Sequence, residues 1–349
     1  MTKRTRLIIL LICVACFFVG ITIIIPYSLG YRFDFGKKEI TKTGGIYVKA
    51  FPAPEEVIID SIISQKPGLF SNEVFIQSLQ SINHAVLVKK TGYYDYSKTI
   101  PVQEQQVTKL ENILLFKTNI RLDVAGDKTQ SPFETKEKYT IKTGNLYDGL
   151  TVVIKNITAF ALQNNNIIWL GTDGFLYNSS QADLSATPTK LTETALKITK
   201  TGVYKIITDS KDIFVIDNKN LLMLNSKTNN LEVFDTPVND AKISPDGKNI
   251  VYYDDKNIYL SPLPNTLAIK NTLYKSNEKI NACLWLNNSY IVFSAGEKII
   301  FSEIDYRGNI NAVSLPQAYK NSQIYFNQQE TKLYILTDKT LLVSERIIP

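Results

Sequence analysis

Few side chains in this sequence have the type and spacing that chemistry requires. The single histidine, His84, begins an alternating apolar segment, and no partner for acid–base chemistry is recognisable beside it. We expect His84 to be a partly exposed strand residue. Asp254 and Asp255 form an adjacent carboxylate pair, which is a candidate cation site. Neighbouring hairpin residues usually point apart, however, so we interpret this pair as turn residues.

The cysteines and the short sequence motifs exclude several kinds of site. Cys13 and Cys16 lie in an uncharged N-terminal segment, and Cys283 stands alone. The rest of the chain therefore has no cysteine pair for a disulfide and no cysteine cluster for a metal. The sequence contains no phosphate loop, zinc spacing, calcium loop or nucleophile elbow. We expect no catalytic residue, no metal and no cofactor.

Charged residues recur at five short turns, each of which follows an apolar segment. If the five segments are equivalent strands, the turns lie at equivalent strand ends and therefore on one face. A ring of mixed charge on that face would bind a polar partner, mainly by setting its association rate and specificity. Alternatively, these are simply the residues that tight hairpins and solvated surfaces prefer. The candidate partner-binding residues are Asp173, Asp217, Asp254, Asp255, Lys256, Glu297, Lys298, Asp338 and Lys339.

The apolar segments before these turns repeat at intervals of about 40 residues, which is typical of the four-stranded blades of a β-propeller. They are residues 167–170, 213–216, 250–253, 291–294 and 333–336. We expect about five blades over residues 150–349, with Trp169 and Trp285 in blade packing. The fifth unit lacks an outer strand, so we expect residues 150–154 to pair with residues 340–345 and close the ring.

The clearest repeat unit spans residues 241–260. Its turn, Ser244-Pro245-Asp246-Gly247-Lys248, resembles the WD-repeat-like β-propellers of bacterial envelope proteins. The other units match less well. Three of them replace Pro-Asp-Gly with Asn-Asn-Asn, Asp-Ser-Lys and Gln-Gln-Glu.

Residues 44–116 alternate in short apolar runs punctuated by proline and glycine, which predicts a small β-sandwich. The expected strands are 46–50, 57–60, 73–77, 85–90, 98–102 and 108–116. The runs Gly45-Ile46-Tyr47-Val48, Phe51-Pro52, Val57-Ile58-Ile59-Asp60 and Val88-Lys89-Lys90-Thr91-Gly92-Tyr93-Tyr94 resemble the PEGA domain. That resemblance implies a sandwich carried by a bacterial envelope protein. Ala53, Pro54 and Glu55 depart from the motif that names the family, and Ser61 stands where a turn glycine is usual.

Residues 7–25 form an uncharged apolar run that is long enough to span a bilayer as a helix. We expect residues 1–30 to be a cytoplasmic tail and a retained single-pass membrane anchor, with the body extracytoplasmic. A cleaved signal peptide is the alternative. Of the net charge of +6, residues 1–6 carry +3 and residues 31–43 carry +2. The body therefore has no basic stripe for nucleic acid.

The predicted organisation is an all-β chain: the anchor, a linker over 31–43, the sandwich over 44–116, a connector over 117–149 and the propeller over 150–349. This pattern favours a non-catalytic, membrane-anchored, extracytoplasmic binding or scaffolding protein of a bacterial cell envelope. Its expected partners are the lipid bilayer and an envelope protein or a cell-wall polymer. The alternatives are a propeller-type hydrolase acting on envelope glycan or peptide, and an accessory sensor subunit.

Overall fold

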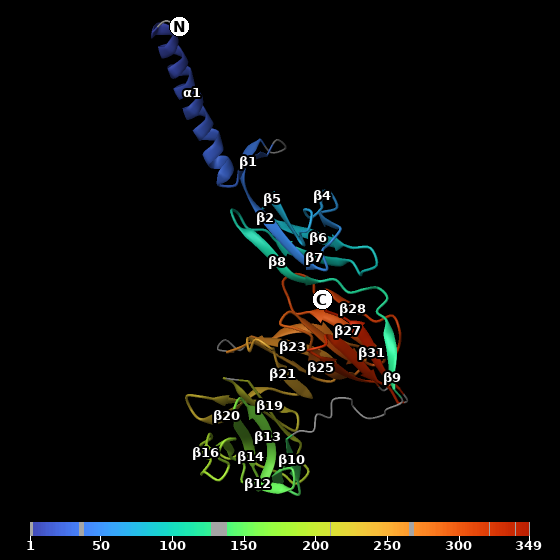
Figure 1. Cartoon of the computed structure of the whole chain (residues 1–349). Coiled ribbons are helices and arrows are strands. Elements are labelled where there is room, and N and C mark those ends of the chain that lie inside the picture. Colours follow the sequence, from blue (N-terminus) through green and yellow to red (C-terminus); the bar gives the residue numbers. More distant parts are fainter. Residues whose placement is uncertain are drawn as a thin grey trace. The chain divides into compact units, whose positions relative to one another are not determined.

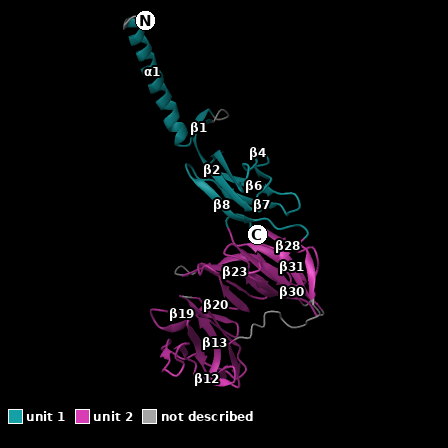
Figure 2. Cartoon of the chain, viewed as in Figure 1, with its two compact units in different colours: residues 1–119, 307–311, 349 teal, residues 120–306, 312–348 magenta. Residues whose placement is uncertain are grey.

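The chain divides into two compact units. A computed structural model describes residues 3–34, 38–126, 138–209, 211–264, 269–320, 322–338 and 340–348, and Figure 1 labels its elements. Unit 1 comprises Met1–Asn119 with Arg307–Asn311, and unit 2 comprises Ile120–Tyr306 with Ala312–Ile348. Figure 2 colours the two units separately. As predicted, the fold is all-β apart from one N-terminal apolar helix.

The helix α1 spans Lys3–Ser28 and belongs to unit 1. Among the described residues it is the one helix long and apolar enough to cross a membrane. Pro26 lies within its last turn, so the helix runs slightly past the predicted apolar run. The N–H of Leu29 still donates to the Ile25 carbonyl, and Gly30 then turns the chain at a positive φ of 86°.

Two four-stranded sheets form the rest of unit 1. The first contains β1 (Tyr31–Asp34), β2 (Glu39–Phe51), β5 (Glu73–Gln80) and β8 (Val107–Leu114). The second runs in the order β4 (Ile63–Gln65), β3 (Glu56–Ile59), β6 (Asn83–Lys89) and β7 (Tyr96–Pro101). In the first sheet β2 pairs antiparallel with β1 and β5 and parallel with β8.

Alternation explains why these segments form a sandwich. Ile46, Val48 and Ala50 on β2 are fully buried and share one apolar core with Val57 on β3 and Val88 on β6. Their neighbours along each strand face outward, because successive side chains of a strand point to opposite faces. The six strands predicted between residues 46 and 116 correspond to β2, β3, β5, β6, β7 and β8.

The segment 31–43 is not the linker that the sequence analysis expects. It forms β1 and the first part of β2, and these pair as a hairpin with Phe33 opposite Ile40. Between its polar residues this segment also contains aromatic and β-branched side chains, which favour strands. Thr43 fixes the base of the hairpin, since both its N–H and its hydroxyl donate to the Gly30 carbonyl at 2.8 Å.

Within its described residues, unit 2 contains five four-stranded antiparallel sheets and one three-stranded sheet. The three-stranded sheet contains β10 (Tyr139–Lys142), β11 (Asn145–Asp148) and β12 (Thr151–Lys155). The next two contain β13 (Ile157–Gln163), β14 (Asn166–Gly171), β15 (Leu176–Ser180) and β16 (Thr189–Lys190), then β17 (Tyr204–Thr208), β18 (Ile213–Asp217), β19 (Asn220–Asn225) and β20 (Asn230–Asp235).

The remaining sheets continue the pattern. One contains β21 (Asp240–Ile243), β22 (Asn249–Tyr253), β23 (Asn257–Pro262) and β24 (Asn271–Lys275). Another contains β25 (Ile280–Trp285), β26 (Tyr290–Ala295), β27 (Lys298–Glu303) and β28 (Ala312–Ser314). The last contains β29 (Gln323–Asn327), β30 (Lys332–Leu336), β31 (Leu341–Arg346) and β9 (Leu122–Gly126).

The sheets pack against one another as propeller blades do, and β18 shows how. Ile213 and Val215 enter the apolar cluster shared with the preceding sheet. Phe214 and Ile216 enter the cluster shared with the following sheet. A strand buried on both faces reads as a continuous apolar run. The five predicted apolar segments are accordingly the second strands β14, β18, β22, β26 and β30.

The predicted ring closure is wrong. The strand that completes the last sheet is β9, which pairs antiparallel with β31 so that Val124 opposes Leu342. Residues 150–154 instead fall largely in β12, which pairs with β11. The segment 117–149, expected to be a connector, therefore supplies β9, β10 and β11, while residues 127–137 lie outside the described residues. These strands are short and polar, so they lack the apolar runs used to recognise the other blades.

Candidate binding site

Unit 2 contains a cavity of about 340 Å³ between the first strands of three successive sheets. Strands β21, β25 and β29 supply most of its wall, and Tyr253 at the end of β22 completes it. The polar side chains that line it are Asp240, Lys242, Tyr253, Asn281, Ser322, Gln323 and Tyr325. Polar groups that converge on one concave surface can orient a bound ligand and make its recognition specific.

Strand alternation places two opposite charges in the cavity. Asp240 and Lys242 lie two residues apart on β21 and both line the cavity. Ala241 and Ile243 lie between and beyond them and pack in the apolar cluster shared with the preceding sheet. A strand with apolar residues on one face and an acid and a base on the other therefore positions the pair.

The two charges of β21 are compensated differently. Lys205 on β17 donates to the carboxylate of Asp240 at 2.5 Å, so Asp240 already has a cationic partner. Lys242 is half-buried, and this burial lowers the pKa of its amine; the nearby Asp240 opposes the shift and Lys205 adds to it. The cavity thus holds an ammonium group that an additional anion would stabilise.

Two further titratable groups of the cavity, Cys283 and Tyr253, are held in their neutral forms. Burial raises the pKa of the Cys283 thiol to about 12, and only 2% of this residue is exposed. Burial also raises the pKa of Tyr253, with a further contribution from Asp240. The Tyr253 hydroxyl donates to the Asn281 carbonyl at 3.2 Å. A protonated thiol is a poor nucleophile, so this chemistry suits recognition better than covalent catalysis.

Register places each of the five charged turns beside the start of the first strand of its sheet. Asp240 begins β21 opposite Tyr253, which ends β22 just before the turn at Asp254. Likewise Ile280 opposes Ala295, and Gln323 opposes Leu336. In every sheet the start of the first strand therefore lies beside the turn between the second and third strands.

Several of the predicted turn residues are engaged locally. Asp254 accepts from the N–H groups of Lys256 and Asn257 at 2.7 Å and from the Tyr259 hydroxyl at 3.0 Å. Burial raises its pKa, but these hydrogen bonds outweigh burial and the net pKa lies below its usual value. Asp173 similarly accepts from Phe175 N–H and the Tyr177 hydroxyl. These acids stabilise their own turns.

The other turn residues contact a neighbouring sheet or an adjacent residue, or are exposed. Asp255 accepts from Asn239 at 2.9 Å and lies 3.9 Å from Lys219 of the preceding sheet. Glu297 lies 3.7 Å from Lys320, and Asp217 accepts from Asn218. Lys256, Lys298 and Asp338 are exposed, and Lys339 lies outside the described residues.

Asp240 and Lys242 are not among the site residues predicted from the sequence, and the prediction for His84 is wrong. The sequence pattern that indicates Asp240 and Lys242 is an acid and a base at alternate positions of an otherwise apolar strand. His84 is buried, with 4% exposure, because it lies on the inward face of β6 with Val86 and Val88. Trp169 and Trp285 are buried as expected; the Trp285 indole donates to the Lys242 carbonyl and links two sheets.

Within the described residues, no three His, Cys, Asp or Glu side chains gather to hold a metal ion.

No protein-family model matches the chain. No curated protein matches it.

Several solved structures resemble the chain in fold. A structure of YCF48 bound to D1 peptide has a TM-score of 0.41 and 11% identity, covering 86% of this chain and 94% of that one. A nidogen/laminin complex has a TM-score of 0.35 and 14% identity, covering 57% of this chain and 88% of that one. A putative TolB from Agrobacterium tumefaciens has a TM-score of 0.37 and 15% identity, covering 53% of this chain and 72% of that one. These scores are below 0.5, so the description of the blades rests on the strand pairing given above.

Proposed function

We propose that the chain is a non-catalytic, membrane-anchored binding or scaffolding protein of a bacterial cell envelope. The length and apolar surface of α1 support anchoring, with the N-terminus cytoplasmic and the β-sheets of both units outside. Three basic residues, Lys3, Arg4 and Arg6, crowd the N-terminal side of the apolar run and support that orientation. The two-sheet sandwich of unit 1 fits the PEGA type, and the sheets of unit 2 fit a WD-repeat-like propeller.

One observation carries the binding proposal: the half-buried ammonium group of Lys242 lines a cavity in which the nearby carboxylate, Asp240, already pairs with Lys205. Removing a cation from water is unfavourable unless an anion compensates its charge, and Asp240 is already paired with Lys205. We therefore propose that the ligand presents a carboxylate to Lys242. Asn281 and Gln323 supply amide groups that suit a peptide or an amino-sugar acid of the cell wall.

The test uses the full-length chain in detergent micelles and soluble cell-wall peptides as the probe. We expect saturable binding by calorimetry, and Lys242→Gln should weaken it by about tenfold, the loss of one charge-assisted hydrogen bond. Lys248→Gln is the matched control. It removes the same charge from a side chain that is 77% exposed, in the turn at the opposite end of the same sheet.

Two outcomes would contradict this function. Equal affinity of the Lys242→Gln variant and the parent would exclude the cavity as the binding site. Release of new reducing ends or amino groups from cell-wall fragments would show turnover and favour the hydrolase instead. Anchoring is tested separately, because an integral protein stays in membranes that are washed at high pH.

A further inference from the structure

The β1–β2 hairpin, which follows the end of α1, exposes apolar side chains. Phe33 and Ile40 oppose each other across the hairpin and are 51% and 69% exposed. Tyr27 and Leu29, at the end of the helix, are also more than half exposed. Exposed apolar residues on a short two-stranded ribbon are unfavourable in water unless another surface covers them.

A cation is fixed beside this apolar surface. The guanidinium of Arg32 donates to the Ser78 hydroxyl at 3.0 Å and to the carbonyls of Tyr27 and Tyr31 at 2.6 and 2.9 Å. It also lies over the Tyr27 ring, 3.5 Å from the centroid. Within the described part of the chain, no carboxylate lies at ion-pair distance from it. Its charge is therefore held in place without a carboxylate partner among the described residues.

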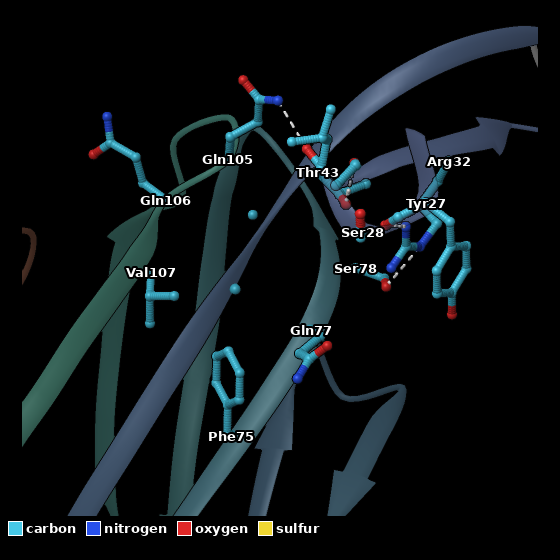
Figure 3. A pocket seen from close by; sticks show the side chains of 14 residues that line it. Tyr27, Ser28, Arg32, Thr43, Phe75, Gln77, Ser78, Gln105, Gln106 and Val107 are labelled. Atoms are coloured by element: carbon cyan, nitrogen blue, oxygen red, sulfur yellow. Dashed lines mark hydrogen bonds between the residues drawn. The ribbon is translucent and has the colours of Figure 1, made fainter. Parts of the chain in front are cut away.

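A cavity of about 560 Å³ opens next to Arg32. Figure 3 shows Arg32 and Tyr27 at one side and Phe75 and Val107 on the strands below. Gly44 and Gly45 of β2 lie between those strands and also line the cavity. The other walls carry hydroxyl and amide groups from Ser28, Thr43, Gln77, Ser78, Gln105 and Gln106.

We propose that this surface binds an anionic phospholipid with hydroxyl groups in its headgroup, such as phosphatidylglycerol, taken from the bilayer that α1 spans. Arg32 holds the phosphate, the amides and hydroxyls of the cavity hold the headgroup, and Phe33 and Ile40 enter the acyl-chain region. The 26 residues of α1 extend about 39 Å, longer than a hydrocarbon core of about 30 Å. Its last turn therefore lies at the headgroup level, where tyrosine and arginine are favourable.

This inference rests on the proposed membrane anchoring, so the experiment separates the two. The full-length Phe33→Trp variant is placed in vesicles of phosphatidylcholine alone or with phosphatidylglycerol, and either lipid is brominated in turn. We expect both brominated lipids to quench the fluorescence of the introduced indole. Brominated phosphatidylglycerol should be enriched near this indole by about fivefold, which corresponds to one fixed basic side chain at an anionic surface.

Paired variants identify the source of the lipid preference. Arg32→Gln should abolish the enrichment while α1 still holds the protein in the membrane. Lys42→Gln is the matched control, because Lys42 lies 3.4 Å from Glu104 and is already neutralised. The buried tryptophans, Trp169 and Trp285, are measured as background in the parent chain.

Each remaining outcome is decisive. If the Phe33→Trp variant survives an alkaline wash but its introduced indole is not quenched, this proposal is overturned. A lipid preference that persists in Arg32→Gln overturns it as well. Displacement of the lipid by free glycerol phosphate would assign a soluble phosphate ligand instead. Loss of the parent chain in the wash would overturn the membrane anchoring itself.

Discussion

The Nδ1 atom of His84 lies 2.6 Å from the Oδ2 atom of Asp60. The other ring nitrogen lies 2.9 Å from the Gln80 carbonyl, and the second oxygen of Asp60 accepts the N–H of Ala85 at 2.8 Å. The imidazole ring thus bridges the Asp60 carboxylate and the Gln80 carbonyl. This contact between buried His84 and the more exposed Asp60 ties the turn after β3 to β6.

Asp60 makes the stability of unit 1 sensitive to acid. Burial raises the pKa of this carboxyl, but the hydrogen bonds from His84 and Ala85 outweigh burial, so the net pKa lies below its usual value. A lowered folded-state pKa gives stability that is present above the unfolded value, about 3.9, and is lost as the pH falls through the folded value. We expect Asp60→Asn to lower stability by about 1 kcal/mol at pH 6 and by less at pH 2.

Hydrogen exchange of unit 1 peptides measures this effect without interference from unit 2. Asp95→Asn is the control, because Asp95 is an exposed carboxylate of the same unit. A difference between Asp60→Asn and the parent that stayed constant from pH 6 to pH 2 would contradict the assignment.

The pairing of β9 with β31 predicts where a disulfide will form. Asp123 and Val343 are cross-strand partners, so the pair Asp123→Cys and Val343→Cys should oxidise and raise the melting temperature of unit 2 by about 5 °C. The competing pair, Val152→Cys with Val343→Cys, tests the closure suggested by sequence and should not oxidise. Both are made with Cys13 and Cys16 replaced by serine and are compared by electrophoresis with and without reductant.

Lys242 predicts a pH dependence of carboxylate binding. Burial lowers the pKa of its amine, so Lys242 loses its proton at a lower pH than an exposed lysine, whose pKa is about 10.4. Affinity for a carboxylate probe should therefore decline with rising pH from a point below that value. Titration calorimetry between pH 6 and pH 10 measures it. In the Lys242→Arg variant the decline should disappear, because the guanidinium stays charged over this range.

Gly44 is predicted to tolerate no side chain. A Cβ atom there would lie 2.3 Å from the Gln103 carbonyl oxygen and 2.8 Å from that of Gln106, and neither backbone atom can move freely. Gly44→Ala should cost about 1–3 kcal/mol and loosen the β1–β2 hairpin. Gly68→Ala is the control, since its Cβ would meet only the Ser71 Cβ at 3.8 Å. Urea unfolding followed by proteolysis compares the two, and equal loss in both variants would refute the prediction.

What the sequence revealed depended on how strongly each residue's environment constrains its type. Phe214 and its neighbours on β18 are apolar because both strand faces are buried, and such a continuous apolar run is evident in the sequence. The hairpin at Phe33 and the closing strand at Val124 are exposed and polar, so their pairing depends on partners that are distant in sequence. Asp240 and Lys242 form a site only because β25 and β29 lie beside β21, which no local pattern reveals.

The position of β9 in the last sheet has a consequence for biosynthesis. Residues 122–126 leave the ribosome long before residues 341–346. The strand β9 therefore lacks its partner β31 while the residues of five sheets are synthesised. Such distant pairing slows folding and leaves a strand edge exposed to other chains in the meantime. Premature termination before β31 would therefore release chains with an open edge at Leu122–Gly126, which makes early truncations more hazardous to the cell than their lost length suggests.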